Sequence, residues 1–342
     1  EEKLIPGGST QQGDSKAVFN VEKPYPAPEL SGIQDWTNSD PQTLAQLKGK
    51  VVLIDFWTYS CINCQRTQPY LNKWYEKYKN DGFVIIGAHA PEFAFEKVPE
   101  NVRNAVKEAN IKYPVALDND FATWQAYNNQ FWPAKYLIDK DGQVRYTHFG
   151  EGNYDETEGA IQTLLKENGR TVTATIDKNN GAAPVQNGQS PETYLSYERG
   201  ERFANTDQFK RDQPVNYTLS DKLAEHEWSL GGSWQVGGKE SVATGDSSVL
   251  RIKFTAKEVY LVMNGPSDQP VTLKLNCQPV TASSNGVSHV DSSGKVHLNC
   301  ARLYRLIKLP QFTKNSTLDL IVPNCTLRSS EHSSDLHSLP HP

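Results

Sequence analysis

Two cysteines separated by two residues, Cys61 and Cys64, have the clearest chemical meaning in this sequence. A thiolate is the nucleophile in thiol–disulfide exchange, and a Cys-x-x-Cys pair across the first turn of a helix suits that reaction. The helix N-terminus lowers the pKa of the first thiol, while the second thiol sits inward. The spacing therefore predicts that Cys61 attacks a disulfide and that Cys64 resolves it. We expect no cofactor besides the redox-active Cys61–Cys64 disulfide.

A zinc site is the alternative that a lone Cys-x-x-Cys leaves open. Structural zinc needs about four ligands, and neither a second Cys-x-x-Cys nor a His-x-x-x-His lies near this pair. Three histidines near the end of the chain, His332, His337 and His341, lack a regular ligand spacing. We therefore expect no metal.

The two residues inside the motif, Ile62 and Asn63, bring neither a positive charge nor a histidine. Without such a group the thiolate of Cys61 is not strongly stabilised, and a strongly oxidising site depends on that stabilisation. The dipeptide therefore predicts a reducing or intermediate redox potential.

The elements around the motif alternate between strand and helix patterns. Apolar strands are predicted over 50–57 and 82–90, and an Asp-Gly turn joins the strands of a hairpin over 135–150. This order is typical of an α/β sandwich with a mixed central sheet. Helical patterns cover four further segments: 68–80, 98–110, 121–127 and 157–168.

A chain of 342 residues is long enough for two buried cores. After residue 190 the pattern changes to short alternating strands with turn residues between them, which predicts an all-β jelly-roll or sandwich. The last residues are polar and could be a tail or an altered final strand. We expect a linker (1–25), an α/β domain (26–168), a linker (169–190), a β domain (191–325) and a tail (326–342).

Composition excludes several classes of function. The net charge is −5 and no basic stretch suits a phosphate backbone. The longest apolar runs fall far short of the roughly 18 residues that span a bilayer. Because the sequence begins Glu-Glu-Lys without Met, we expect a processed product or a fragment of a longer chain.

The other three cysteines are Cys277, Cys300 and Cys325. An odd total of five excludes a closed set of intrachain disulfides. Cys277 and Cys300 lie at the ends of neighbouring strand patterns, and an exported protein could join them. Cys325 is left over in either case.

The segment VVLIDFWTYSCINC, with Asp55 and Trp57 ahead of the cysteines, resembles thioredoxin. The resemblance implies that Asp55 shuttles a proton to and from the inward thiol and that Trp57 packs beside the site; simple core packing of Trp57 is the alternative. In FWPAKYLID, Trp132-Pro133 fits the cis-proline that faces the cysteines in this fold. An ordinary trans-proline is the alternative there.

Longer stretches, including APEFAFEKVPENV and YPVALDNDFATWQAYNNQFWPAKYLID, resemble the soluble part of the DipZ family, relatives of the TlpA-like thioredoxins. The resemblance implies a periplasmic thiol–disulfide oxidoreductase. A CcdA-like membrane unit would supply its electrons, disulfide-bearing proteins would receive them, and residues 1–25 would form a membrane tether. Glu92 matches a family position that could line the groove, although a solvated loop acid is the alternative.

The second domain resembles the C-terminal, carbohydrate-binding-module-like part of the same family. Aromatic side chains that stack on sugars would carry such binding, and the candidates are Trp228, Trp234 and Tyr197. Core packing is the alternative for each of them. Two other functions are alternatives. One is an envelope-anchored carbohydrate- or protein-binding module with a minor redox role, and the other is a peroxidase, for which Cys64 and Arg66 do not supply the required neighbours.

Overall fold

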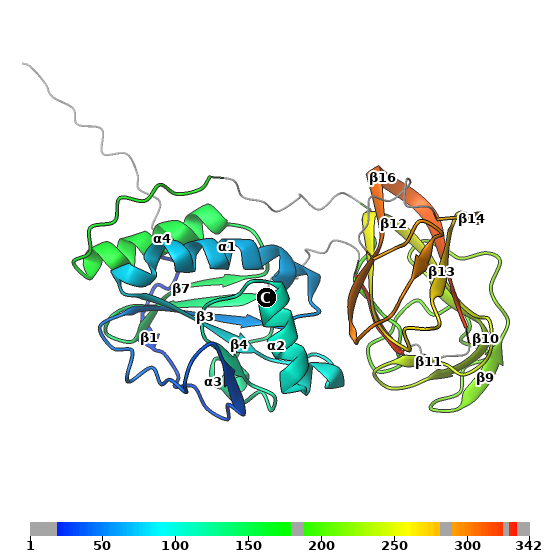
Figure 1. The fold of residues 1–342 in the computed structure, drawn as a ribbon, viewed down its shortest axis with the longest axis horizontal. Helices are drawn as coiled ribbons and strands as arrows, with labels where there is room; N and C mark the ends of the chain where they lie inside the picture. Colours follow the sequence, from blue (N-terminus) through cyan, green and yellow to red (C-terminus); the bar gives the residue numbers. More distant parts are fainter. Residues whose placement is uncertain (1–18, 179–187, 281–288, 324–327, 334–342) are drawn as a thin grey trace, which may run out of the picture.

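The computed structural model describes residues 19–178, 188–280, 289–323 and the strand 328–333. They form two domains that lie side by side, an α/β domain and a β-rich domain (Figure 1). The predicted fold class is therefore confirmed for both halves of the chain. No helix among the described residues is both long and apolar enough to cross a membrane.

A seven-stranded mixed sheet is the centre of the α/β domain, with the strand order β1-β7-β6-β3-β4-β5-β2. Every residue of β3 is buried, as expected for a central strand that is covered on both faces. β3 pairs in parallel with β4 and antiparallel with β6. The strands are β1 (Tyr25–Pro26), β2 (Asp35–Thr37), β3 (Val51–Trp57), β4 (Phe83–His89), β5 (Val115–Leu117), β6 (Ala134–Ile138) and β7 (Gln143–Phe149).

Helices cover this sheet, and apolar side chains from both layers form two cores. The helices are α1 (Ile62–Tyr78), η1 (Lys79–Asp81), η2 (Ala94–Lys97), α2 (Pro99–Glu108), α3 (Ala122–Ala126) and α4 (Tyr154–Glu167). Leu71 and Trp74 of α1 and Leu164 of α4 belong to the same core as β3. α1 therefore leads directly from the cysteine motif into the packed interior.

The segments predicted as linkers extend less far than expected. Phe19 and Val21 pack against the cores, and the Arg145 guanidinium lies 4.5 Å from the centre of the Phe19 ring. After α4, Val172 and Ala174 pack on the same domain. These apolar residues are separated by polar neighbours, so their contacts gave no periodic signal. Residues 1–18 and 179–187 lie outside the described residues.

The β-rich domain is a ten-stranded antiparallel sheet that folds on itself as a sandwich. Register shifts at three places in the pairing with β16 allow β12 to bend, so that its first part pairs with β10 and its last part with β17. The strands are β8 (Thr193–Tyr194), β9 (Pro214–Tyr217), β10 (Trp228–Val236), β11 (Ser241–Ala243), β12 (Ser248–Asn264), β13 (Val271–Leu275), β14 (Gln278–Pro279), β15 (Lys295–Val296), β16 (Arg302–Val322) and β17 (Arg328–Ser333).

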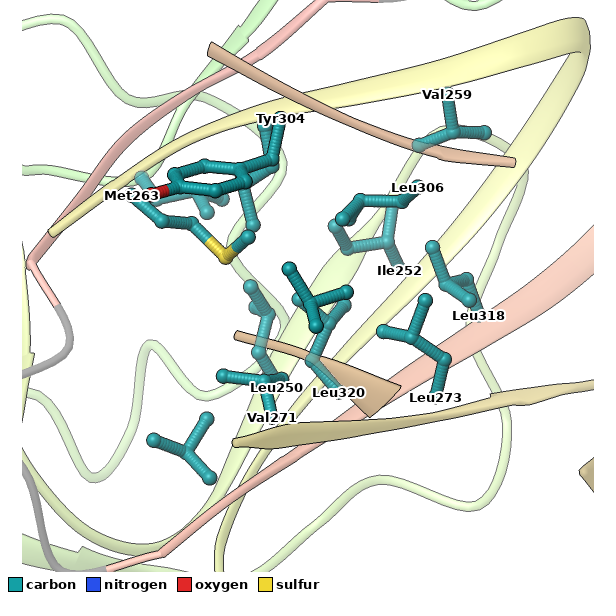
Figure 2. Close-up of a cluster of buried hydrophobic side chains, with 14 of the residues drawn as sticks. Leu250, Ile252, Val259, Met263, Val271, Leu273, Tyr304, Leu306, Leu318 and Leu320 are labelled. Carbon is teal, nitrogen blue, oxygen red and sulfur yellow. The ribbon is translucent and has the colours of Figure 1, made fainter. Parts of the chain in front are cut away.

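Inward side chains of β12, β13 and β16 fill the core of this domain (Figure 2). Along β12, Leu250, Ile252, Val259 and Met263 contribute to it, and Leu318 and Leu320 approach from β16. Burial of side chains of this size stabilises a fold by roughly 1.5–3 kcal/mol each. The domain therefore has its own hydrophobic core, independent of the first.

The predicted tail at 326–342 contains a strand. Residues 328–333 form β17, which pairs antiparallel with β8, β11 and β12. Its sequence, RSSEHS, has no apolar residue, so the hydrophobic pattern could not reveal it. Cys325 and residues 334–342 lie outside the described residues.

Candidate active site

The cysteine motif lies in the connection between β3 and α1 and at the start of α1. β3 ends at Trp57, α1 begins at Ile62, and Cys61 caps the helix: its Sγ accepts a hydrogen bond from the backbone N–H of Cys64 at 3.3 Å. Cys64 is buried, whereas Cys61 is half-buried. Both are free thiols. This arrangement places the first sulfur at the positive end of a helix dipole and the second sulfur inside the domain.

The pKa of Cys61 differs from the sequence-based expectation. Its thiol pKa is raised well above the ordinary value, because the hydrogen bond with the Cys64 side chain and burial favour the protonated form. The negative charge of Glu192, a residue of the β domain, adds to the rise. The hydrogen bond from the Cys64 N–H opposes it but does not prevail. The sequence could not predict this result, since it depends on how the side chains around Cys61 are placed in the folded protein.

A buried ion pair lies beneath the cysteines. Asp55 of β3 and Lys135 of β6 are both fully buried, and Asp55 Oδ1 lies 3.8 Å from Lys135 Nζ. Burial raises the pKa of Asp55 to about 7, although the charge of Lys135 opposes the shift. Burial also lowers the pKa of Lys135, which feels the charges of Asp55 and then of Cys64. Lys135 was missed at the sequence level, although a lysine inside the apolar strand AKYLI was a visible signal.

The aromatic and proline residues predicted for the site gather at the same end of the sheet. Trp57 is buried and lies edge-on to His89, with the ring centres 5.2 Å apart. The Trp132–Pro133 peptide bond is cis, and the indole Nε1 of Trp132 donates to the Ala90 carbonyl at 3.0 Å. Trp57 thus packs in the core beside the motif.

Two acids follow β4, and they have different partners. Glu92 is not a solvated loop acid: its carboxylate accepts hydrogen bonds from Tyr194 and Arg199 of the β domain. Glu96 is fully buried and accepts from both the backbone N–H and the hydroxyl of Ser60, at 3.1 and 2.6 Å. Glu96, which was missed at the sequence level, therefore holds the loop that immediately precedes Cys61.

The carbohydrate-binding prediction is wrong for two of its three residues. Trp228 and Trp234 are almost fully buried in the β-domain core and cannot stack on a sugar. Their indole N–H groups donate to backbone carbonyls, of Glu201 and Gly231 respectively. Tyr197 is half-buried, packs on Phe209 and donates its hydroxyl proton to Asp212. The WSLGGSWQV pattern reflects core packing.

Replacement of Trp228 by alanine tests this assignment. Trp228 is buried and stacks on Phe203, with ring centres 4.2 Å apart, so Trp228→Ala should lower the free energy of unfolding of the β domain by about 3–5 kcal/mol. Urea denaturation followed by circular dichroism measures the loss. The half-buried Tyr197→Ala serves as the control with a smaller loss. A Trp228→Ala loss no larger than that of the control would contradict core packing.

Cys277 and Cys300 are exposed free thiols in the β domain, so the structure does not join them. Cys300 lies just before β16, next to Ala301, whose carbonyl accepts a hydrogen bond from the hydroxyl of Tyr59. Among the described residues, no group of three or more histidine, cysteine or acidic side chains is arranged to hold a metal ion.

Comparisons with known proteins agree with this geometry. Residues 23–165 match the family described as Redoxin, and residues 190–328 match the one described as Thioredoxin like C-terminal domain. The thiol-disulfide oxidoreductase YkuV of Bacillus subtilis is 33% identical over 143 residues, which cover 42% of this chain and 95% of that protein. Fold, motif and relatives define a thioredoxin-like thiol–disulfide oxidoreductase.

The relationship extends through both domains. Protein DipZ of Mycobacterium tuberculosis is 39% identical over 284 residues, and the same figures hold for Protein DipZ of Mycobacterium bovis. The match covers 78% of this chain and 40% of the relative. The chain belongs to the DipZ-like thioredoxin-domain proteins. It spans about 40% of the length of these relatives.

Proposed function

We propose that this protein reduces disulfide bonds in other proteins outside the cytoplasm, with Cys61 as the attacking residue and Cys64 as the resolving one. The observation that carries the proposal is the position of Cys61 at the N-terminus of α1, where its Sγ accepts a hydrogen bond from the backbone N–H of Cys64, whose thiol is buried. Asp55 and Lys135 lie beneath, where a proton from Cys64 can be held.

The reaction runs in two exchanges. The Cys61 thiolate attacks one sulfur of the substrate disulfide, a mixed disulfide forms, and the other substrate sulfur leaves as a thiolate that takes up a proton. Cys64 then gives its proton to the Asp55 carboxylate and attacks Cys61 Sγ, which releases the second substrate thiolate. The substrate gains two electrons, and the protein is left with a Cys61–Cys64 disulfide.

A membrane protein of the CcdA-like kind is proposed as the electron donor that restores the two thiols. The support is the DipZ resemblance. In this proposal the chain acts in the periplasm, tethered to the inner membrane.

An insulin-reduction assay tests the proposed activity. With dithiothreitol as the donor, the protein should accelerate precipitation of the insulin B chain well above the rate with dithiothreitol alone. A binding module with a minor redox role, the alternative function, predicts no acceleration. An unchanged rate would therefore contradict the proposal.

Carbohydrate binding by the β domain is a second proposal. Because Trp228 and Trp234 are buried, it now concerns only the surface around Tyr197. The Tyr197 ring is half-exposed and lies beneath the Arg211 guanidinium, 5.0 Å from its centre. A sugar-binding Tyr197 predicts that Tyr197→Ala weakens retention on polysaccharide columns. Equal retention of both proteins would remove this role.

We predict a reducing midpoint for the Cys61–Cys64 couple, nearer to thioredoxin at about −270 mV than to DsbA at about −120 mV. The pKa of Cys61 is raised, so no stabilised thiolate favours the reduced form. Equilibration with glutathione buffers, followed by thiol trapping and mass spectrometry of the 61–64 peptide, measures the midpoint. A value more positive than about −180 mV, the isomerase value on this scale, would contradict electron delivery.

A further inference from the structure

The β domain packs on the face of the α/β domain that carries the cysteines. Ile62, inside the motif, is only 5% exposed because it forms an apolar cluster with Tyr260 and Val262 of β12 and Leu303 of β16. Phe93, just after β4, and Phe95 of η2 pack against the same cluster. The residue next to the attacking thiol is therefore covered by the second domain.

Polar contacts surround this cluster on both sides of the motif. Ahead of Cys61, the Tyr59 hydroxyl donates to the Ala301 carbonyl at 3.4 Å. After Cys64, the Arg66 guanidinium lies 5.7 Å from the centre of the Tyr260 ring. The contacts thus involve residues before, within and after the Cys-x-x-Cys motif.

Two ion pairs hold the domains together at the rim. Arg199 Nη1 lies 2.5 Å from Glu92 Oε1, and Arg302 Nη1 lies 3.5 Å from Glu108 Oε2. The first pair is reinforced by Tyr194, whose hydroxyl donates to the same Glu92 oxygen at 3.0 Å. Arg199 and Arg302 belong to the β domain, and both acids belong to the α/β domain, so each pair crosses the interface.

We infer that the β domain occupies the surface on which a substrate protein docks, and that protein disulfides reach Cys61 only when the two domains separate at this interface. The inference rests on the proposed function, since it concerns access to the same thiol. A protein substrate needs room around the motif, and Ile62, Phe93 and Phe95 already have a partner there. Apolar side chains of this kind, freed by separation, would then form the docking surface for the substrate.

The interface has the properties of a reversible contact. Its apolar part is small, and its ion pairs include the half-exposed side chain of Arg199. Interfaces of this mixed character between domains of one chain permit relative motion. The negative charge of Glu192 also adds to the rise in the pKa of Cys61 while the domains are together. Separation would remove both the steric block and that charge.

Alkylation of Cys61 by reagents of different size tests the inference on the full, reduced chain. N-ethylmaleimide is compared with a maleimide that carries a long polyethylene glycol chain, and the modified cysteine is identified by peptide mass spectrometry. Arg199→Glu places a second acid opposite Glu92, so it should speed the reaction of Cys61 with the bulky reagent by about three- to tenfold relative to the small one. Raised salt should produce the same selective gain in the unmodified protein, because it screens both ion pairs.

The sequence offers a matched control. Arg211 also belongs to the β domain and also lies over a tyrosine ring, that of Tyr197, as Arg199 lies over Tyr194. Among the residues that the structure describes, Arg211 forms no ion pair with the α/β domain, so Arg211→Glu should leave both rates unchanged. The charge-swapped pair Glu92→Arg with Arg199→Glu should restore the slow reaction with the bulky reagent.

Two results would overturn the inference. One is an equal rate for the small and bulky reagents in the unmodified protein, and the other is an Arg199→Glu rate equal to that of Arg211→Glu. Alkylation does not depend on turnover, so this test of the covered thiol is independent of the insulin assay. If the alkylation rate of Cys61 depends on reagent size but the protein does not reduce insulin, the inference that the β domain covers Cys61 would be supported and the proposed activity would be contradicted.

Discussion

Cys61→Ser is expected to lower insulin reduction by at least about a thousandfold, to the rate of dithiothreitol alone. A serine hydroxyl at the N-terminus of α1 cannot form the mixed disulfide with which the reaction begins. Cys64→Ser should lose multiple turnover as well, but for another reason. It can form the mixed disulfide through Cys61 and cannot resolve it.

The two variants therefore differ in a measurable intermediate. With an oxidised protein substrate, Cys64→Ser should accumulate a covalent complex that reducing agents dissolve, and Cys61→Ser should accumulate none. Mass spectrometry of the acid-quenched mixture detects the complex. Cys300→Ser, which alters an exposed thiol of the β domain, serves as the control with unchanged turnover. If Cys61→Ser forms the covalent complex instead, the assigned roles are reversed.

The second large effect is expected at Asp55. Asp55→Asn keeps the size of the side chain but removes the carboxylate that accepts the Cys64 proton, so the rate of resolution at neutral pH should fall by about a hundredfold. In the unmodified protein this rate should rise as pH increases through about 7, where Asp55 loses its proton. The variant should lack that rise. Rapid-quench measurement of mixed-disulfide decay against pH gives both profiles.

The same carboxyl affects stability in a defined direction. Its pKa is 3.8 in the unfolded chain and about 7 in the folded protein, so the folded state binds more protons between these values. Stability therefore falls as pH rises from about 4 to 7, and Asp55→Asn should remove this part of the slope. Asp120→Asn, at an exposed position, is the control, and it should leave this pH dependence of stability unchanged. An Asp55→Asn protein with an unchanged pH–rate profile would exclude the proton-acceptor role.

The α/β domain could be predicted from sequence because its signals are local. The buried strand that ends at Trp57, the cysteine spacing and the Asp-Gly hairpin each lie within a short window, and they fix the order of the elements around the site. The fold class and the position of Cys61 and Cys64 followed from them. Only one member of the Asp55–Lys135 pair could be predicted, since the aspartate belongs to a familiar motif and the lysine does not.

What could not be predicted depends on contacts between segments far apart in the chain. The rise in the pKa of Cys61 comes partly from Glu192, and Glu92 is bound by Arg199, more than a hundred residues later. No periodic pattern reports such contacts. The sugar-binding prediction for Trp228 and Trp234 was wrong for a related reason. In an alternating strand pattern, an aromatic residue that faces a core cannot be distinguished from one that faces a ligand.

β12 has two faces with separate tasks. Leu261 and Met263 point into the β-domain core, while Tyr260 and Val262 point toward Ile62 of the other domain. Because the side chains of a strand alternate, a shift of one residue in its pairing with β16 would exchange these two sets. The cover over the cysteines therefore exists only when the β domain has paired its strands in the native register. A chain with a misfolded β domain would carry a permanently accessible thiol pair, so correct folding of one half of the molecule controls the reactivity of the other.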